Sequence, residues 1–317
     1  MHPRRRIKWI LTSGLGNQLY GYFAGQYVAE KLNLQIQYIH NPLSEKHEQH
    51  NSDIRSFVLN HPVRRAKTHF LFPKKLRRIL FGIKRRSSSI SKIYDFSIRK
   101  YAEKSFEMQL ESKELEIELR KYPKRTLHVE GYFQDFSYYN NFKNIKTLEL
   151  KDPSEWYLKT KDRTQLIKPI IVHLRLGDYI EQPNIWGILG ATYYEEALKR
   201  IRLAFPDNEI WIFSDNFERA KKLLKGVKEF DLNYIEPSSD QDPAEVLKIM
   251  SGGIAHVLSN STFSLWATMI SENSKLAVIP EPFFKNVVGQ ARNLPNEWVK
   301  IRATWASEAV ITSISQH

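Results

Sequence analysis

The chain has 317 residues, of which 42% are hydrophobic and 26% charged, so it can bury a large core and form more than one domain. It contains no cysteine, which excludes disulfides, thiolate metal sites and a cysteine nucleophile. Lysine and arginine outnumber aspartate and glutamate by 13 (48 against 35), and such a charge attracts phosphates, nucleic acid or anionic lipid.

No apolar run approaches the ~18 residues that span a bilayer. The basic start, residues 1–6, is followed only by Ile7–Leu11, which Lys8 interrupts, so we do not expect a signal peptide. Absence of cysteine fits a reducing compartment. The sequence therefore predicts a cytoplasmic protein without a membrane span.

Ile7–Leu11 is expected to be a strand that ends in a glycine turn, Ser13-Gly14-Leu15-Gly16-Asn17-Gln18, before a long apolar helix. This geometry places backbone N–H groups and a positive helix end at a crevice. A dinucleotide fingerprint would need a third glycine where Leu19 stands, so that motif fails. Asn17 can be a simple N-cap, but we favour a ligand-facing role for Asn17 and Gln18 together.

A basic segment follows the expected strand Gln35–Ile39 and the polar loop Asn41–Ser52. Residues 61–94 contain no acidic residue, and between 64 and 86 ten basic residues alternate with phenylalanine, leucine and isoleucine. This composition fits an amphipathic segment on an anionic membrane surface. A solvated basic helix over the core is the alternative, and nucleic-acid binding comes third because no known module frames the patch.

The middle of the chain predicts a helix over Glu103–Lys121, a strand over Thr126–Glu130 and an aromatic stretch over 131–139, which we interpret as core rather than a sugar-stacking platform. Lys151–Lys168 is polar and flanked by prolines, so we take it as the domain boundary. The expected domains are 1–155 and 165–295, with 296–317 as a tail or helix.

After residue 169, strands and helices alternate with short links, which predicts a parallel sheet wound on both faces. The expected strands begin at Ile170 and cover Glu209–Phe213, Phe230–Ile235, Ala255–Leu258 and, last, Leu276–Ile279. Polar residues follow several of these strands, and carboxyl ends of parallel strands meet at one edge. We therefore expect these polar groups and the glycine turn after Ile7–Leu11 to converge.

The first of these strands runs into His173, Arg175, Gly177 and Asp178. Arg175 offers a fork of donors suited to phosphate, His173 a neutral donor or acceptor, and Gly177 a close approach of the backbone. The alternative is a polar turn with a surface salt bridge.

Asp240 and Asp242 match the Asp-x-Asp pair that holds a divalent ion in one class of sugar-nucleotide enzymes. However, Pro243 and Glu245 follow at the positions expected for a helix start. We therefore interpret Asp242 as a helix cap and predict no metal site.

Five motifs in order resemble bacterial α-1,2-fucosyltransferases, glycosyltransferase family 11. They are Gly14-Leu-Gly-Asn-Gln18, Gly131-Tyr-Phe-Gln134, His173-Leu-Arg-Leu-Gly-Asp-Tyr179, Phe213-Ser-Asp215 and Asn260-Ser-Thr-Phe-Ser-Leu-Trp266. The resemblance implies an α/β chain of two Rossmann-like domains facing a cleft (GT-B type). It further implies GDP-β-L-fucose as the donor, inversion at the anomeric carbon and no cofactor or metal.

By the same resemblance Arg175 holds the diphosphate, Asp215 reads the guanine, and Ser261, Thr262 and the adjoining helix start hold phosphate. The whole expected donor-binding set is Gly14, Gly16, Asn17, Gln18, Arg175, Ser214, Asp215, Asn260, Ser261, Thr262 and Phe263. Many family members carry a second arginine where this chain has Leu176, so here Arg175 would bind the diphosphate without that second guanidinium.

The expected reaction is attack by a galactose 2-hydroxyl of a glycan acceptor, which is lipid-linked if the basic segment lies on the inner membrane surface. Asp178, Glu181 and His173 are the candidates for the base. The rivals are another nucleotide sugar, a metal-dependent transferase and a nucleic-acid-binding α/β protein.

Overall fold

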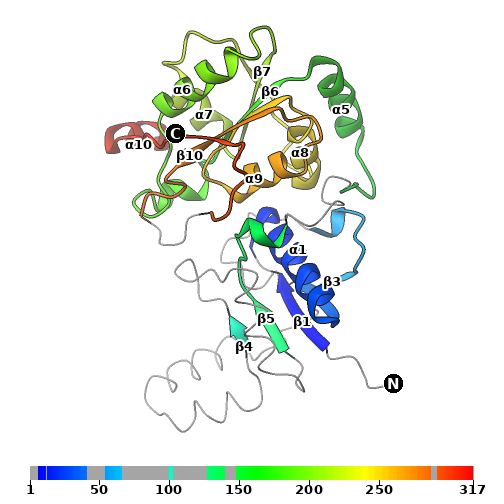
Figure 1. The fold of residues 1–317 in the computed structure, drawn as a ribbon. Helices are drawn as coiled ribbons and strands as arrows, with labels where there is room; N and C mark the ends of the chain where they lie inside the picture. Colours follow the sequence, from blue (N-terminus) through cyan, green and yellow to red (C-terminus); the bar gives the residue numbers. More distant parts are fainter. Residues whose placement is uncertain are drawn as a thin grey trace, which may run out of the picture. The chain divides into compact units, whose positions relative to one another are not determined.

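The computed structural model describes residues 6–11, 13–40, 54–65, 100–102, 127–139, 148–286 and 291–316. Two compact units make up the chain. The first comprises Met1–Arg55 and Leu59–Asn141, and the second comprises Ser56–Val58 and Phe142–His317. Each unit has its own parallel sheet, which confirms the expected α/β class (Figure 1).

The sheet of the first unit has the order β3-β2-β1-β5-β4, with all described pairs parallel. Its strands are β1 (Arg6–Leu11), β2 (Gln35–His40), β3 (Val63–Arg65), β4 (Lys100–Ala102) and β5 (Leu127–Glu130). Helix α1 (Leu15–Leu32) follows β1 directly, as expected, and is buried almost continuously as far as Ala29. Short 3-10 turns cover Ile54–Ser56 and Phe136–Tyr138.

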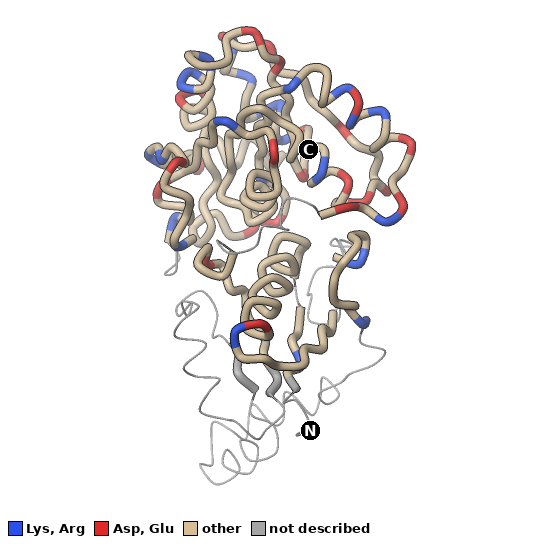
Figure 2. The backbone as a smooth tube through the Cα atoms, turned by 45° about the vertical axis from the view of Figure 1, so that its right-hand side comes forward, with Lys and Arg blue, Asp and Glu red and all other residues tan. Residues whose placement is uncertain are grey.

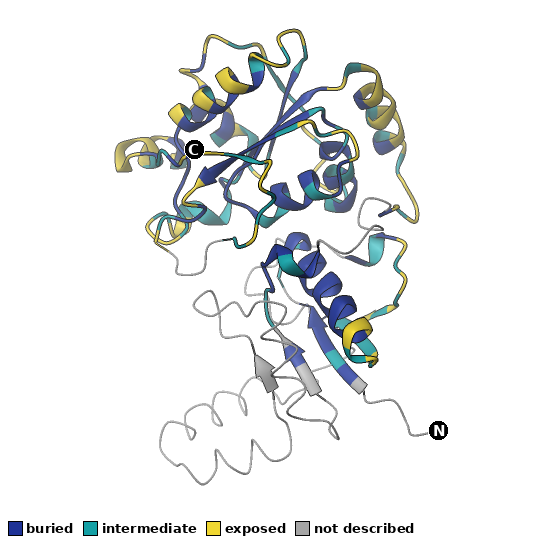
Figure 3. Cartoon of the chain, in the orientation of Figure 1, coloured by how far each residue is buried: buried dark blue, intermediate teal, exposed yellow. Residues whose placement is uncertain are grey.

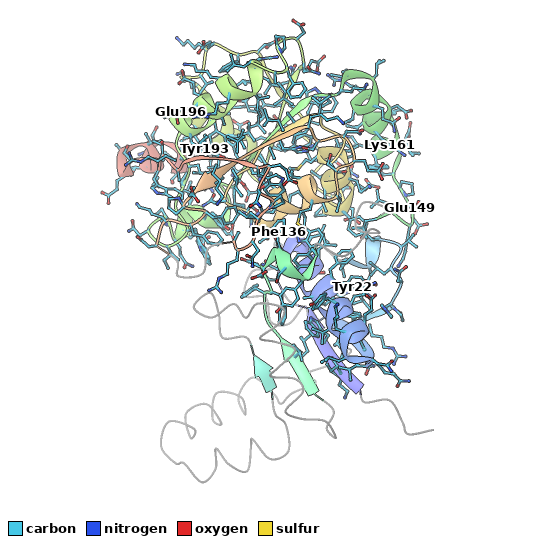
Figure 4. All side chains as sticks on the ribbon, in the orientation of Figure 1. Tyr22, Phe136, Glu149, Lys161, Tyr193 and Glu196 are labelled. Atoms are coloured by element: carbon cyan, nitrogen blue, oxygen red, sulfur yellow. The ribbon has the colours of Figure 1, made fainter. Side chains whose placement is uncertain are left out.

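Aromatic side chains fill the core of this unit. Trp9 and Phe133 are completely buried, with ring centroids 4.7 Å apart, and Tyr22 and Phe136, both labelled in Figure 4, are 2% exposed. The aromatic stretch over 131–139 is therefore mainly core, as predicted.

The second sheet has the order β11-β10-β9-β6-β7-β8, again all parallel. Its strands are β6 (Ile170–Leu174), β7 (Ile210–Ser214), β8 (Leu232–Tyr234), β9 (Ala255–Val257), β10 (Leu276–Glu281) and β11 (Val299–Arg302). From the central β6 the chain first builds outward through β7 and β8, and then returns to add β9 on the other side. Figure 3 shows the central strands β6, β7 and β9 buried.

The helices lie on both faces of this sheet, as the alternating pattern predicted. They are α5 (Glu155–Ile167), α6 (Ala191–Arg202), α7 (Phe217–Leu224), α8 (Pro243–Met250), α9 (Thr262–Met269) and α10 (Glu308–Ser315). In Figure 1, α6 and α7 cover one face and α8 and α9 the other. Alternate β6 residues, Ile170, Val172 and Leu174, pack with Tyr193 and Leu198 of α6 in one apolar core.

The segment Lys151–Lys168, which we took as the domain boundary, contains helix α5, and Ser154 caps this helix by accepting from Tyr157 N. The boundary itself stays a prediction. One expectation was wrong: the strand predicted at Leu276–Ile279 exists within β10, but it is not the last strand, because β11 follows and pairs alongside it. The helix allowed within 296–317 exists as α10.

The basic segment is largely outside the described residues, as are the predicted loop over 41–52 and the predicted helix over 103–121. In the described residues of the second unit, basic and acidic side chains are interspersed (Figure 2). Within the part of the chain that the structure describes, no helix combines the length and apolar character needed to cross a bilayer.

Candidate active site at the carboxyl edge of the second sheet

The strand order of the second sheet has a topological switch point between β6 and β9. β6 and β9 are neighbours, but the chain continues from β6 to β7 on one side of the sheet and from β9 to β10 on the other side. Ligands of open α/β sheets bind outside the carboxyl ends of the strands at such a switch point. Arg175 follows β6, Asp215 follows β7, and Ser259 lies two residues after β9. Contacts between these strand ends confirm the expected convergence within the second unit. The part of that expectation that includes the glycine turn of the first unit stays a prediction.

Arg175 is held by two carboxylates. Its Nη2 lies 2.8 Å from Asp178 Oδ1 and its Nη1 lies 2.9 Å from Asp215 Oδ2. Burial alone would lower the pKa of Arg175, but Asp215 and then Asp178 outweigh it and raise the pKa above its ordinary value. The guanidinium is therefore permanently charged and fixed in one place, while its side chain remains 18% exposed.

Asp215 also fixes the turn that carries Arg175. Its Oδ1 accepts a hydrogen bond from Leu176 N at 2.7 Å, and on the same turn Arg219 Nη1 donates to Leu176 O at 2.9 Å. A Cβ added to Gly177 would lie 2.6 Å from Asp215 Oδ2. Only glycine leaves room for this carboxylate, which is the close approach that the sequence suggested.

Tyr179 supports the guanidinium from its ring face. Arg175 Cζ lies 5.5 Å from the centroid of this ring, which is a cation–π distance, and Trp186 stacks on Tyr179 with centroids 5.5 Å apart. The Tyr179 hydroxyl donates to Asn260 O at 3.1 Å. Burial raises the pKa of Tyr179, so the phenol stays protonated.

His173, on β6, is 5% exposed and its Nδ1 lies 2.7 Å from Ser259 Oγ. Its ring centroid is 5.7 Å from that of Phe263 in the first turn of α9. Burial lowers the pKa of His173 to about 4, with Asp215 opposing this shift and Arg175 adding to it. The imidazole is therefore neutral at ordinary pH.

Three of the remaining predicted donor-binding residues of this unit have local hydrogen-bond partners. Asn260 is 1% exposed, and its Nδ2 donates to the carbonyls of Trp186 and Gly187 at 2.9 and 3.0 Å. Ser261 caps α9 by accepting from Phe263 N, and Ser214 Oγ bonds the backbone of Asn216. Thr262 is half-buried at the first position of α9.

The two carboxylates proposed as bases differ in their surroundings. Asp178, at the start of a short 3-10 turn (Asp178–Glu181), is paired with Arg175 and is 33% exposed. Glu181, at the end of that turn, is exposed to solvent. Both therefore lie within a few residues of the guanidinium, but only Asp178 contacts it.

In the first unit the glycine turn forms a separate group. Gly14 is the N-cap position of α1 and Gly16 lies buried in its first turn. Asn17 Nδ2 donates to Ser13 Oγ at 3.2 Å, and its Oδ1 accepts from Gln134 Nε2 at 2.9 Å. Asn17 thus bonds side chains around the turn rather than acting as the N-cap.

Gln18 lies in the interior of the unit. It is completely buried, its Nε2 donates to Ser13 O at 2.8 Å, and its Oε1 accepts from Ile54 N at 3.0 Å. Its amide therefore joins two backbone segments, and the ligand-facing role expected of Asn17 and Gln18 stays a prediction.

Asp242 is a helix cap, as predicted: its Oδ1 accepts from Ala244 N at 2.8 Å, and its Oδ2 accepts from Ser56 Oγ at 2.5 Å. Glu245 does not reach back to complete a capping box, because its carboxylate accepts from Ser154 N and Ser154 Oγ instead. Among the described residues no group of three or more His, Asp and Glu gathers as a metal site.

Sequence reasoning missed Ser259, Trp186 and Arg219 as parts of this site. Ser259 stands directly before the Asn260 motif, so its position after a strand was a usable signal. Trp186 lies in the segment between β6 and α6, and Arg219 lies in α7. No local pattern marks either residue as part of the site.

The chain was compared with known proteins. The family model described as Glycosyl transferase family 11 matches residues 59–302. The chain is 25% identical over 208 residues to an alpha-1,2-colitosyltransferase of Escherichia coli (62% of this chain, 69% of that protein). It is 25% identical over 167 residues to the O-antigen biosynthesis glycosyltransferase WbnK of Escherichia coli (49% and 54%). The solved structure of fucosyltransferase NodZ from Bradyrhizobium matches with a TM-score of 0.44 and 12% identity, over 86% of this chain and 97% of that one.

Proposed function

The chain belongs to glycosyl transferase family 11, and on that premise we propose that it transfers L-fucose from GDP-β-L-fucose to the 2-hydroxyl of a galactose-ended glycan. The transfer inverts the anomeric carbon and needs no metal. The proposal includes a GT-B arrangement in which residues 165–295 hold the GDP-sugar.

One observation carries the proposal: a charged arginine held at the carboxyl edge of a doubly wound sheet. Arginine has five N–H donors, and the ion pairs with Asp178 and Asp215 each use one nitrogen, which leaves N–H groups for phosphate oxygens. Prior fixation of the guanidinium avoids reorganisation when charge develops, the condition under which such donors are most effective.

In the proposed reaction the acceptor oxygen forms a bond to C1 of fucose while the bond from C1 to the diphosphate oxygen breaks. The bonding electrons leave with GDP, and the transition state resembles an oxocarbenium ion. Arg175 stabilises the charge that collects on the leaving diphosphate. The acceptor proton passes to a base, for which Asp178, Glu181 and His173 are the candidates.

The name of one relative favours a second candidate donor. That relative is a colitosyltransferase, and colitose is L-fucose without its 3-hydroxyl. A donor pocket shaped for either sugar would keep the same GDP contacts, so the two candidates differ only around C3 of the transferred sugar.

The test combines a donor panel with one variant pair. Thermal shifts and product analysis with GDP-fucose, GDP-colitose, UDP-galactose and CMP-sialic acid should show stabilisation and transfer with a GDP-linked 6-deoxy sugar. Arg175→Ala should lower kcat/KM on the order of 10²–10³-fold, whereas Arg200→Ala, which removes an exposed arginine of α6, should leave it unchanged. Activity of Arg175→Ala within tenfold of the wild type would refute the role of Arg175.

Two further parts of the proposal have separate tests. Full activity in excess EDTA is expected, and loss that Mg²⁺ restores would favour a metal-dependent enzyme. A lipid-linked acceptor would account for the basic segment between 64 and 86. If that segment binds membranes, vesicles with anionic lipid should sediment the protein at low salt, and failure to do so removes this part.

A further inference from the structure

The hydroxyl of Ser259 determines which nitrogen of His173 carries a hydrogen. The two side chains are both buried, and the Nδ1–Oγ distance of 2.7 Å is that of a good hydrogen bond. A neutral imidazole has one N–H and one bare nitrogen, so either Ser259 donates to Nδ1 or Nδ1–H donates to Ser259. These alternatives give the site opposite chemistry at Nε2.

The neighbouring Ser264 decides between them. Its hydroxyl hydrogen is directed to a backbone carbonyl, that of Ser261 at 2.9 Å or that of Ser259 at 3.1 Å. The Oγ atoms of Ser259 and Ser264 are 3.4 Å apart, which is long for a bond between hydroxyls.

If Nδ1–H donated to Ser259, the Ser259 hydroxyl hydrogen would have, among the residues that the structure describes, only this long contact to Ser264. A completely buried donor without a good acceptor is what folded proteins avoid. The Ser259 hydrogen therefore belongs to the 2.7 Å contact with His173, so Nδ1 is the acceptor and Nε2 carries the ring hydrogen.

The Nε2–H group is available to a ligand. No residue in the described part of the chain hydrogen-bonds to Nε2, yet it is not among the unpartnered side-chain atoms that are sealed from solvent. His173 lies near the carboxyl end of β6, two residues before Arg175, and its ring packs against Phe263 in the first turn of α9. The nucleotide-sugar donor is proposed to bind at this edge of the sheet.

We propose that Ser259 fixes His173 as a neutral hydrogen-bond donor whose Nε2–H binds an oxygen of the GDP portion of the donor, so that His173 is not the base. Ser259 is then a positioning residue. The identity of the ligand rests on the proposed function, but the ring tautomer does not. The base is left to a carboxylate, and Asp178 and Glu181 are the nearest in sequence.

The tautomer is measured on the free protein by ¹H–¹⁵N NMR of ¹⁵N-histidine-labelled, deuterated chain. The sequence has ten histidines, and the His173 signals are assigned by their loss in His173→Gln. We expect a protonated, pyrrole-like Nε2 and a bare, pyridine-like Nδ1 at pH 7. The reverse pattern would overturn the proposal. In Ser259→Ala the pattern should shift toward a mixture of both tautomers.

Kinetics distinguish a donor from a base. The amide nitrogen of glutamine reaches about the position of Nε2 and can donate but cannot take up a proton. His173→Gln should therefore keep kcat within about tenfold of the wild type, while His173→Ala falls on the order of 10²–10³-fold. Equal collapse of both variants, with both folded by circular dichroism, would indicate a base and contradict the proposal. His256→Gln, at a buried histidine outside the site, is the control.

Addition of GDP alone tests the ligand. The Nε2 signal of His173 should shift on binding in the wild type, and an unchanged signal in a saturated complex would refute the GDP contact. If no GDP-sugar is a substrate but Nε2 is protonated in the free protein, the proposed function fails and the tautomer assignment stands.

Discussion

Gly177 is the position where the smallest change should disturb the site most. In Gly177→Ala the new Cβ would lie 2.6 Å from Asp215 Oδ2 and 3.1 Å from its Cγ. This carboxylate cannot rotate freely, because Oδ2 pairs with Arg175 and Oδ1 accepts from Leu176 N at 2.7 Å. Relief of the overlap must therefore weaken one of these two contacts.

Overpacking of this kind costs about 1–3 kcal/mol. If the whole cost falls on the placement of Arg175 in the transition state, kcat/KM should fall by about 5- to 150-fold. If it falls on the folded state, the melting temperature should drop by about 2–4 °C per kcal/mol for a domain of this size.

The assay is initial-rate kinetics together with calorimetry on Gly177→Ala and Gly226→Ala. Gly226 is an exposed glycine of the same unit, and a Cβ added there meets nothing within 4 Å. The control should match the wild type in both measurements. If Gly177→Ala also matches it, Asp215 is not pinned between Arg175 and Leu176, and our account of the turn is wrong.

Two predictions concern stability. Ser154→Ala removes both the cap of α5 and a hydrogen bond to the buried Glu245 carboxylate, so the free energy of unfolding in urea should fall by about 1–3 kcal/mol. The control Ser307→Ala, which removes the exposed cap of α10, should lower it by less. Equal losses would contradict a role for Glu245. Burial lowers the pKa of His173 and His256 from 6.5 to about 4. The unfolded chain therefore binds protons that the folded chain rejects, and the unfolding free energy should fall by up to about 1.4 kcal/mol per pH unit per histidine as pH decreases from about 6.5 toward 4. A flat urea-midpoint profile over this range would refute it.

The alternation of strands and helices in the second unit was predictable because its central strands are short, buried and mainly apolar. β6 and β7 are almost entirely inaccessible, and their polar residues His173 and Ser214 come only after three or more apolar residues, so both strands stand out against the amphipathic helices. The observed bounds fall within a residue or two of the predicted ones for both strands.

Helix α5 and strand β11 were not predictable in the same way. Only Tyr157 and Thr164 of α5 are buried, which leaves almost no periodic apolar signal in the sequence. β11 is four residues long, and its pairing with β10 depends on a neighbour outside its own sequence window. For both elements, local sequence does not determine helix or strand, and tertiary contacts do.

At the candidate site, the sequence predicted polar groups at strand ends that lie together in the second unit, but it did not predict the direction of their side chains. Gln18 and Asn260 both follow strands and were expected to face a ligand, yet each uses its amide to hold backbone groups of its own unit. An amide suits both tasks equally well. For Arg175 the ambiguity was smaller, because a guanidinium next to two carboxylates has a fixed geometry.

The packing of Asn260 has a consequence for how the protein can be produced. Asn260-Ser261-Thr262 is an acceptor sequence for N-linked glycosylation, but the nitrogen that would carry the sugar already donates to Trp186 O and Gly187 O, and the residue is 1% exposed. Once folded, the chain offers no access to an oligosaccharyltransferase. A glycan attached during synthesis in a eukaryotic secretory host would instead keep the loop carrying Trp186 from closing on the sheet.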